Sequence, residues 1–215
     1  MPQPDHVMAL PAPNDAKLAR TLDEGMKSYF QVCREKLGLV PNVLRAYAFR
    51  PAKLKTFVAF YNELMLGDSG LSKVEREMIA VVVSSTNHCF YCIAAHGQAL
   101  RELSGDPELG EMLVANYRVA KLSPRHRAML DFAYKLTVRP AEITADDRAA
   151  LRKAGFADAD IFDIADTIGF YNMSNRVAIG LDMMPNREYH GRSRTASAPR
   201  PSHRKAGALR AKKKR

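Results

Sequence analysis

The chain has 215 residues, enough for one large domain or two small ones, and a 47% hydrophobic, 26% charged composition excludes disorder along its whole length. It lacks any run of 18 uncharged apolar residues, and its first residues form neither a basic start nor an apolar segment, so we expect a soluble, cytoplasmic protein without membrane contact. The net charge of +10 belongs to the last 30 residues, which hold 11 Lys/Arg and 1 Glu, while the other 185 residues hold 22 basic and 22 acidic side chains.

Helix signals follow one another along the neutral part of the chain. Asn14 is a candidate N-cap, and the pairs Ser72/Glu75 and Thr144/Asp147 have the spacing of capping boxes. The expected helices cover residues 15–37, a short stretch after Asn42, 51–66, 73–83, 88–103, 107–119, 124–137, the stretch from Thr144 to Gly155, and 158–180. The β-branched run at 79–86 is assigned to a helix because the capping box precedes it. No segment alternates with period 2, so the sequence predicts an all-α fold.

The residues with the clearest chemistry lie within 77–96. On a helix, Cys89, Cys92 and His96 fall within an arc of about 60°, so two thiols and an imidazole share one face. If the polar residues before them end one helix, Cys89 lies in the first turn of the next. There, free backbone N–H groups and the helix dipole favour a thiolate.

Glu77 joins this group only if the chain reverses. In one continuous helix Glu77 would lie about 18 Å from Cys89. If the chain instead turns near Thr86 and Asn87 into an antiparallel helix pair, Glu77 and His96 come opposite each other. The spacing then predicts a relay in which the carboxylate orients the imidazole and the imidazole accepts the thiol proton.

This constellation resembles the alkylhydroperoxidase D-like enzymes of the carboxymuconolactone decarboxylase-like superfamily. Their signature is Glu, eleven residues, Cys-x-x-Cys, three residues and His, which corresponds here to Glu77, Cys89, Cys92 and His96. The resemblance extends over roughly residues 35–190. It includes LGLVPNVLRAYAFRP, the LT-x-x-P ending at Pro140, and LRKAGFADADIFDIADTIGFYNMSNRVAIGL, all similar to the peroxidase-related branch.

The resemblance implies a helical bundle that reduces hydroperoxides without a cofactor or metal. It also implies regeneration by an external thiol reductant, such as a dithiol or lipoyl-type protein, and a homo-oligomer, trimeric or hexameric. By the same resemblance Cys92 attacks the peroxide, Cys89 resolves the product, and Glu77 and His96 relay the proton. Better-studied members carry a histidine where this chain has Tyr91.

Three alternatives stay open at this stage. A disulfide oxidoreductase would need the same activated thiol and resolving partner. A structural zinc site could use Cys89, Cys92 and His96 as three ligands. Its fourth ligand would come from Cys33, His88 or Glu77. A regulatory or binding module on the same fold would show no thiol turnover.

Some residues have a simpler interpretation. Cys33 stands alone in an amphipathic stretch and is expected to be a small buried hydrophobe. Asn172, Asn175 and Arg176 interrupt the apolar face of the last helix, where polar contacts at a subunit interface are the simpler explanation.

The C-terminal residues have a different composition from the rest. Residues 191–215 combine Pro, Ser and many basic side chains with almost no large apolar residue, so we expect a disordered tail after a helical domain at 1–190. Binding to nucleic acid, if present, is expected only through this tail.

Overall fold

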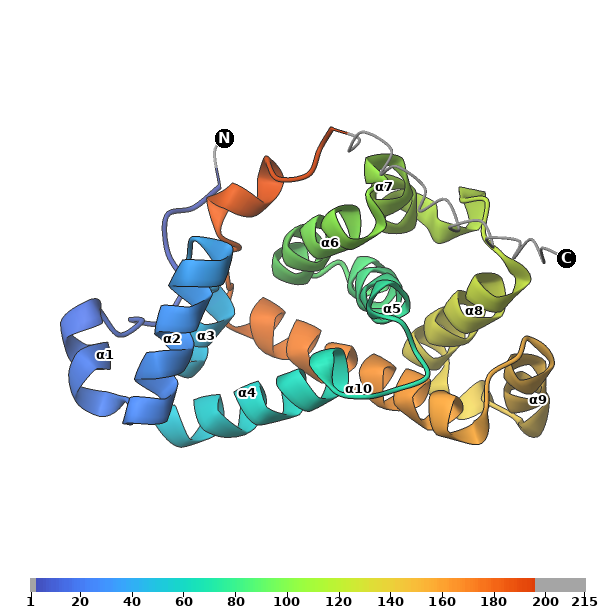
Figure 1. Ribbon diagram of the computed structural model, residues 1–215, viewed down its shortest axis with the longest axis horizontal. Coiled ribbons are helices and arrows are strands. Elements are labelled where there is room, and N and C mark those ends of the chain that lie inside the picture. The colour runs from blue at the N-terminus through green and yellow to red at the C-terminus, as the bar shows by residue number, and fades with distance from the viewer. Residues whose placement is uncertain (1–2, 196–215) are drawn as a thin grey trace, which may run out of the picture.

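The computed structural model describes residues 3–195 and contains helices but no strand among them (Figure 1). The all-α prediction is therefore confirmed. The α-helices are α1 (Asp15–Thr21), α2 (Glu24–Leu37), α3 (Asn42–Tyr47), α4 (Pro51–Leu66), α5 (Lys73–Thr86), α6 (Phe90–Ser104), α7 (Pro107–Asn116), α8 (Pro124–Val138), α9 (Ala145–Lys153) and α10 (Asp158–Gly180). Three short 3₁₀ helices are η1 (Tyr117–Val119), η2 (Pro140–Glu142) and η3 (Arg187–His190). None of the helices described is long and apolar enough to cross a membrane.

The prediction of one helix over residues 15–37 was wrong in one respect. The structure has two helices there, α1 and α2. Leu22 is extended, and the side chain of Asp23 accepts a hydrogen bond from the N–H of Met26, which starts α2. A side chain that satisfies a free N–H in this way allows a helix to begin anew. Gly38 ends α2 in the left-handed conformation, with φ of 69°.

Asn42 is also placed differently from the prediction. The residue before it is the N-cap of α3, and Asn42 is the first residue of the helix. Its side chain donates to the carbonyl of Met184 at 2.9 Å, and its backbone N–H donates to Oδ1 of Asn186 at 2.7 Å. The polar atoms expected to cap a helix instead connect it to the C-terminal part of the chain.

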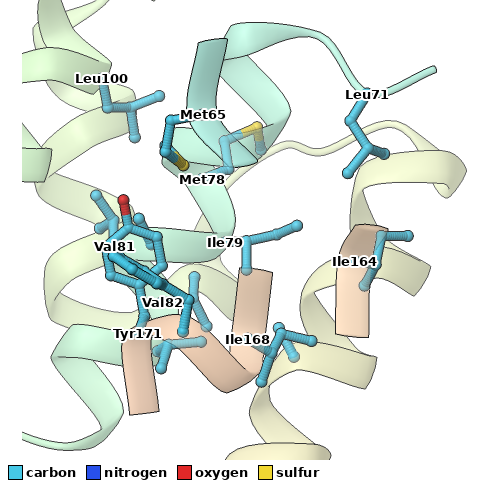
Figure 2. Packing of buried hydrophobic residues seen from close by; sticks show 14 of the residues in the cluster. Met65, Leu71, Met78, Ile79, Val81, Val82, Leu100, Ile164, Ile168 and Tyr171 are labelled. Carbon is cyan, nitrogen blue, oxygen red and sulfur yellow. The ribbon is translucent and has the colours of Figure 1, made fainter. Parts of the chain in front are cut away.

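Helix α5 is the centre of the fold. Every residue from Glu75 to Ser84 is buried, and α6, α7, α8 and α10 pack around it. Figure 2 shows Ile79 and Val82 of α5 beside Ile168 and Tyr171 of α10. Residues 78–83 are apolar on every face of the helix, as expected for a helix in a core.

Candidate active site

The turn between α5 and α6 positions the two thiols. Asn87 is the C-cap of α5, and His88 has a φ of 54°, which reverses the chain. The backbone N–H of Cys89 then donates to the carbonyl of Ser84 at 2.9 Å. Cys89 is the N-cap of α6, so Cys92 lies in the first turn of that helix.

The reversal brings Glu77 and His96 into contact. Oε2 of Glu77 lies 2.8 Å from Nδ1 of His96, and the side chains are only 8% and 12% exposed. The hydroxyl of Tyr171, from α10, lies 3.4 Å from the same nitrogen, and its ring contacts the imidazole edge to face. Among residues 3–195, Nε2 of His96 has no hydrogen-bond partner. The ring is thus held at Nδ1, and Nε2 is available for another hydrogen bond.

The two thiols are both free and almost fully enclosed, with Cys89 1% and Cys92 2% exposed. The Cys92 thiol, backbone N–H groups at the start of α6 and the positive charge of His96 together lower the pKa of Cys89 to about 7, against the effect of burial. The hydrogen bond with Cys89 and burial raise the pKa of Cys92 well above its usual value. When the pair has lost one of its two protons, the two sulfurs share the remaining proton, and the negative charge lies mainly on Cys89.

A cavity of about 230 Å³ reaches Cys92 and His96 but not Cys89. Its walls are mainly aromatic and aliphatic. The tyrosines lining it are Tyr29, Tyr61, Tyr91, Tyr171 and Tyr189. Cys92 is thus the sulfur that a ligand in this cavity would meet.

Cys33 also lines this cavity. It is buried, as expected, and burial raises its pKa above the usual value. Its location beside the cavity of Cys92 could not be predicted from an isolated cysteine in α2.

A larger cavity, of about 650 Å³, opens on the other side of Phe57 and Phe170. Its lining is apolar apart from Thr56 and two cations, Arg50 and Lys53, and it holds neither a thiol nor an imidazole. The chemistry expected from the sequence therefore belongs to the smaller cavity.

Tyr91 lies between α6 and α3 and lines the cavity beside Cys92. It is buried, its hydroxyl accepts a hydrogen bond from the N–H of Val43 at 3.0 Å, and burial raises its pKa well above the usual value. His88, the nearest alternative imidazole, is exposed in the turn. Tyr91 thereby joins α6 to α3.

The zinc alternative finds no support in the part of the chain that the structure describes. Those residues contain no group of three or more His, Cys, Asp or Glu that could hold a metal ion.

Two neighbouring polar residues of α10, Ser174 and Asn175, belong to the site although the sequence did not predict this. Asn175 is fully buried in the described chain, and its side chain contacts Ser84 and Asn87. The sequence interpretation of Asn175 as a polar contact on a subunit interface was therefore wrong. The only available signal was an interruption of an apolar helix face, which does not specify the partner.

The C-terminal residues of the described chain cover one side of the site. The guanidinium of Arg101 donates to the carbonyls of Tyr189 at 3.0 Å and Arg192 at 3.2 Å. Arg192 in turn donates to the carbonyl of Leu37 at 2.8 Å. Contacts with the helices thus continue past residue 190, where the tail was expected to begin, and residues 196–215 of that expected tail lie outside the described part.

The chain is similar in sequence and fold to several known proteins. Residues 51–135 match the carboxymuconolactone decarboxylase family. An uncharacterized peroxidase-related protein from Silicibacter sp. TM1040 is 60% identical, with a TM-score of 0.84 over 90% of this chain and 100% of the other. The alkylhydroperoxidase AhpD core of an uncharacterized peroxidase-related protein from Ralstonia eutropha JMP134 is 39% identical, with a TM-score of 0.85 over 90% and 100% of the two chains. The debrominase Bmp8 is 15% identical, with a TM-score of 0.70 over 86% and 93%, and shares the fold.

Proposed function

The chain belongs to the alkylhydroperoxidase AhpD-like proteins of the carboxymuconolactone decarboxylase superfamily, and from this premise we propose that it is a thiol-dependent peroxidase. The observation that carries the proposal is the buried Glu77–His96 pair, whose imidazole lines the same cavity as the Cys92 sulfur. Because the debrominase Bmp8 has the same fold, the fold alone does not define the reaction. The proposal therefore depends on the site.

Activation of the thiol pair follows from the orientation of His96. The Glu77 carboxylate holds a proton on Nδ1, so Nε2 is the nitrogen that can accept a proton. Nε2 takes the proton of the dithiol, directly or through a water molecule, and the charge of the resulting imidazolium is balanced by Glu77. The carboxylate thus orients the base and stabilises its charged form.

In the reaction, the Cys92 thiolate attacks the O–O bond of a hydroperoxide. The sulfur becomes a sulfenic acid, and the alkoxide leaves as an alcohol after taking the proton from His96. The Cys89 thiol then attacks the sulfenic sulfur, which forms the Cys89–Cys92 disulfide and releases water. An external dithiol returns the pair to two thiols and leaves as its own disulfide.

The proposal is tested by following the reduction of tert-butyl hydroperoxide with dihydrolipoamide or dithiothreitol as electron donor. We expect turnover by the native protein and none by Cys92→Ser. Without an added thiol donor, Cys89→Ser should consume one equivalent of hydroperoxide and stop at the sulfenic acid. Reduction of an unrelated disulfide substrate is measured in parallel. Turnover of that disulfide without any turnover of hydroperoxide would overturn the peroxidase proposal in favour of a disulfide oxidoreductase.

A further inference from the structure

We propose that Phe57 of α4 and Phe170 of α10 form an aromatic wall that restricts the substrate to compact hydroperoxides. The wall separates the cavity that holds Cys92 and His96 from the larger apolar cavity. The inference rests on the proposed function, in which Cys92 attacks the peroxide. It names the class of hydroperoxide that can reach this sulfur.

The two phenylalanine rings are the boundary between the cavities. Of the described residues that line either cavity, Phe57 and Phe170 alone line both. Both side chains are buried, and their ring centroids lie 5.5 Å apart with an interplanar angle of 30°. A ligand can pass from one cavity to the other only by displacing one of these rings.

Other aromatic rings hold the wall in place. Tyr47, which lines the larger cavity, stacks on Phe57 with the ring centroids 4.1 Å apart. Tyr171 packs edge to face against Phe170 at 5.3 Å, and its ring also contacts the imidazole of His96 at 4.7 Å. Close-packed rings with neighbours on several sides keep a fixed arrangement. The wall is therefore a fixed boundary of the reaction cavity.

The volume of the reaction cavity limits the size of the ligand. It is about 230 Å³, whereas pockets for drug-sized ligands usually have roughly 300–1,000 Å³ and an apolar cavity of about 150 Å³ is enough for benzene. A compact apolar hydroperoxide, such as tert-butyl or cumene hydroperoxide, matches this range. The aromatic and aliphatic lining suits the same compounds.

The position of the O–O group within a longer molecule also matters. The cavity opens at the end of α2, where the exposed side chains of Lys36 and Leu37 line it. A chain with a terminal O–O group can leave its tail in this opening. A fatty-acid hydroperoxide carries chain on both sides of its O–O group, so its second arm has to extend deeper and meets the wall. The wall therefore excludes mid-chain hydroperoxides.

The test measures binding without peroxide chemistry. Two alcohols replace the hydroperoxides: cumyl alcohol has the shape of cumene hydroperoxide, and ricinoleic acid is a fatty acid with a hydroxyl in the middle of its chain. Each alcohol is added to the reduced full chain, and the rate at which iodoacetamide labels Cys92 is followed by peptide mass spectrometry. A ligand in the cavity protects Cys92 from labelling.

In the native protein we expect cumyl alcohol to protect Cys92 and ricinoleic acid to leave its labelling unchanged. Phe57→Ala opens the wall, so the second arm of ricinoleic acid can enter the larger cavity. Burial of two or more additional CH₂ groups should then strengthen its binding roughly tenfold. If Phe57→Ala does not fold, Phe57→Leu, which removes the ring and keeps an apolar side chain, should shift the preference in the same direction.

The matched control is Phe60→Ala. Phe60 lies on the same helix as Phe57 and contacts Phe170 edge to face at 5.2 Å, but of the two cavities it lines only the larger one. This variant should keep the native preference for the compact alcohol. An equal gain of ricinoleic acid binding in Phe60→Ala would overturn the wall, because the effect would then come from a general loosening of α4.

Equal protection by the two alcohols in the native protein, or protection by neither, would also overturn the wall. An unchanged preference in the folded Phe57 variants would do the same. Turnover of cumene hydroperoxide by the native protein is scored separately. Selective protection without such turnover refutes the peroxidase and retains the wall, whereas turnover without selective protection does the reverse.

Discussion

The imidazole of His96 is oriented by one carboxylate, so Glu77 is the residue whose change isolates the relay. Glu77→Gln preserves the shape of the side chain but removes its charge, and His96→Ala removes the base itself. We expect both to slow peroxide reduction, with His96→Ala at least as severe, because general acid–base assistance is typically worth about 10²–10⁴-fold. Stopped-flow measurement of thiol oxidation by tert-butyl hydroperoxide reports the rate.

The matched control for this prediction is Glu102→Gln. Glu102 lies on the same helix as His96 and lines the same cavity, but its described hydrogen bond is to Gln98. It should leave the rate unchanged. If Glu77→Gln also oxidises at the native rate, Glu77 is only a structural partner of the imidazole.

The shared proton of the thiol pair gives a pH prediction. Because the pKa of Cys89 is lowered to about 7, the protein should carry no thiolate at pH 5 and one at pH 8. The raised pKa values of Cys92 and Cys33 place their ionisation above the usual range of a cysteine thiol. Absorbance at 240 nm should therefore rise in one step near pH 7, and peroxide reactivity should rise through the same range.

Cys33→Ser should leave the step near pH 7 in place, since Cys33 belongs to α2 and not to the thiol pair. A single combined transition near pH 9 would show that neither motif thiol is activated in the free protein.

At this scale, the sequence predicted those contacts that depend on local spacing. Glu77 and His96 are 19 residues apart, and one chain reversal at the α5–α6 turn is sufficient to bring them together. Tyr171 and Asn175 reach the site from α10, which is separated from α6 by the three α-helices α7, α8 and α9. No spacing rule connects them to α6, because their approach depends on how α10 packs against α5.

At the scale of the elements, cap residues were the most informative signals. The predicted capping box at Ser72/Glu75 forms with both hydrogen bonds, and at Thr144 the backbone N–H donates to Oδ2 of Asp147 at 2.7 Å. Each of the two helices begins where expected. The break at Leu22 was not predicted because apolar residues continue at helical spacing on both sides of it. Periodicity describes which face is buried and does not reveal a change of direction.

The capping box of α5 gives a stability prediction. The hydroxyl of Ser72 accepts from the N–H of Glu75 at 3.1 Å, and Ser72→Ala removes this bond at the start of the central helix. The free energy of unfolding should fall by about 0.5–2 kcal/mol, the usual cost of an N-cap. Urea denaturation followed by circular dichroism measures it.

A control for the cap is Thr56→Ala on α4. Thr56 is exposed, and its hydroxyl only donates to the carbonyl of Ala52 within the same helix. It should change the stability by less than about 0.5 kcal/mol. If Ser72→Ala and Thr56→Ala lower the free energy of unfolding by the same amount, the capping box contributes nothing specific to stability.

At the scale of the whole molecule, the C-terminal segment, residues 187–195, packs against the helices. Arg101 is buried, and the carbonyls of Tyr189 and Arg192 are its hydrogen-bond partners. Arg194 pairs with Glu111 at 2.7 Å. Composition alone suggested a solvated tail here, since these contacts use backbone carbonyls and charged side chains rather than apolar anchors.

Two truncations separate this segment from the residues that follow it. A chain that ends at residue 195 should melt at the native temperature, because every contact described above is retained. A chain that ends at residue 191 should melt lower, because the buried guanidinium of Arg101 loses the carbonyl of Arg192 and keeps only that of Tyr189. Differential scanning calorimetry compares them, and equal melting temperatures would show that the contacts of Arg192 and Arg194 do not contribute to stability.

The chain that ends at residue 195 also tests the role of the basic tail. Residues 196–215 hold eight Lys/Arg and no acidic residue. Any affinity for DNA or RNA should disappear in the chain that ends at residue 195 and should fall steeply with salt in the full chain. Salt-independent binding by the shortened chain would place the interaction on the helical body.

The most direct test of the peroxidase account is the identity of the disulfide formed by peroxide. One equivalent of tert-butyl hydroperoxide is added to the reduced protein, free thiols are alkylated, and peptides are analysed by mass spectrometry. We expect a disulfide between Cys89 and Cys92 with Cys33 still reduced, although Cys33 lines the same cavity as Cys92. Two free motif cysteines after oxidation, or Cys33 joined to either of them, would contradict it.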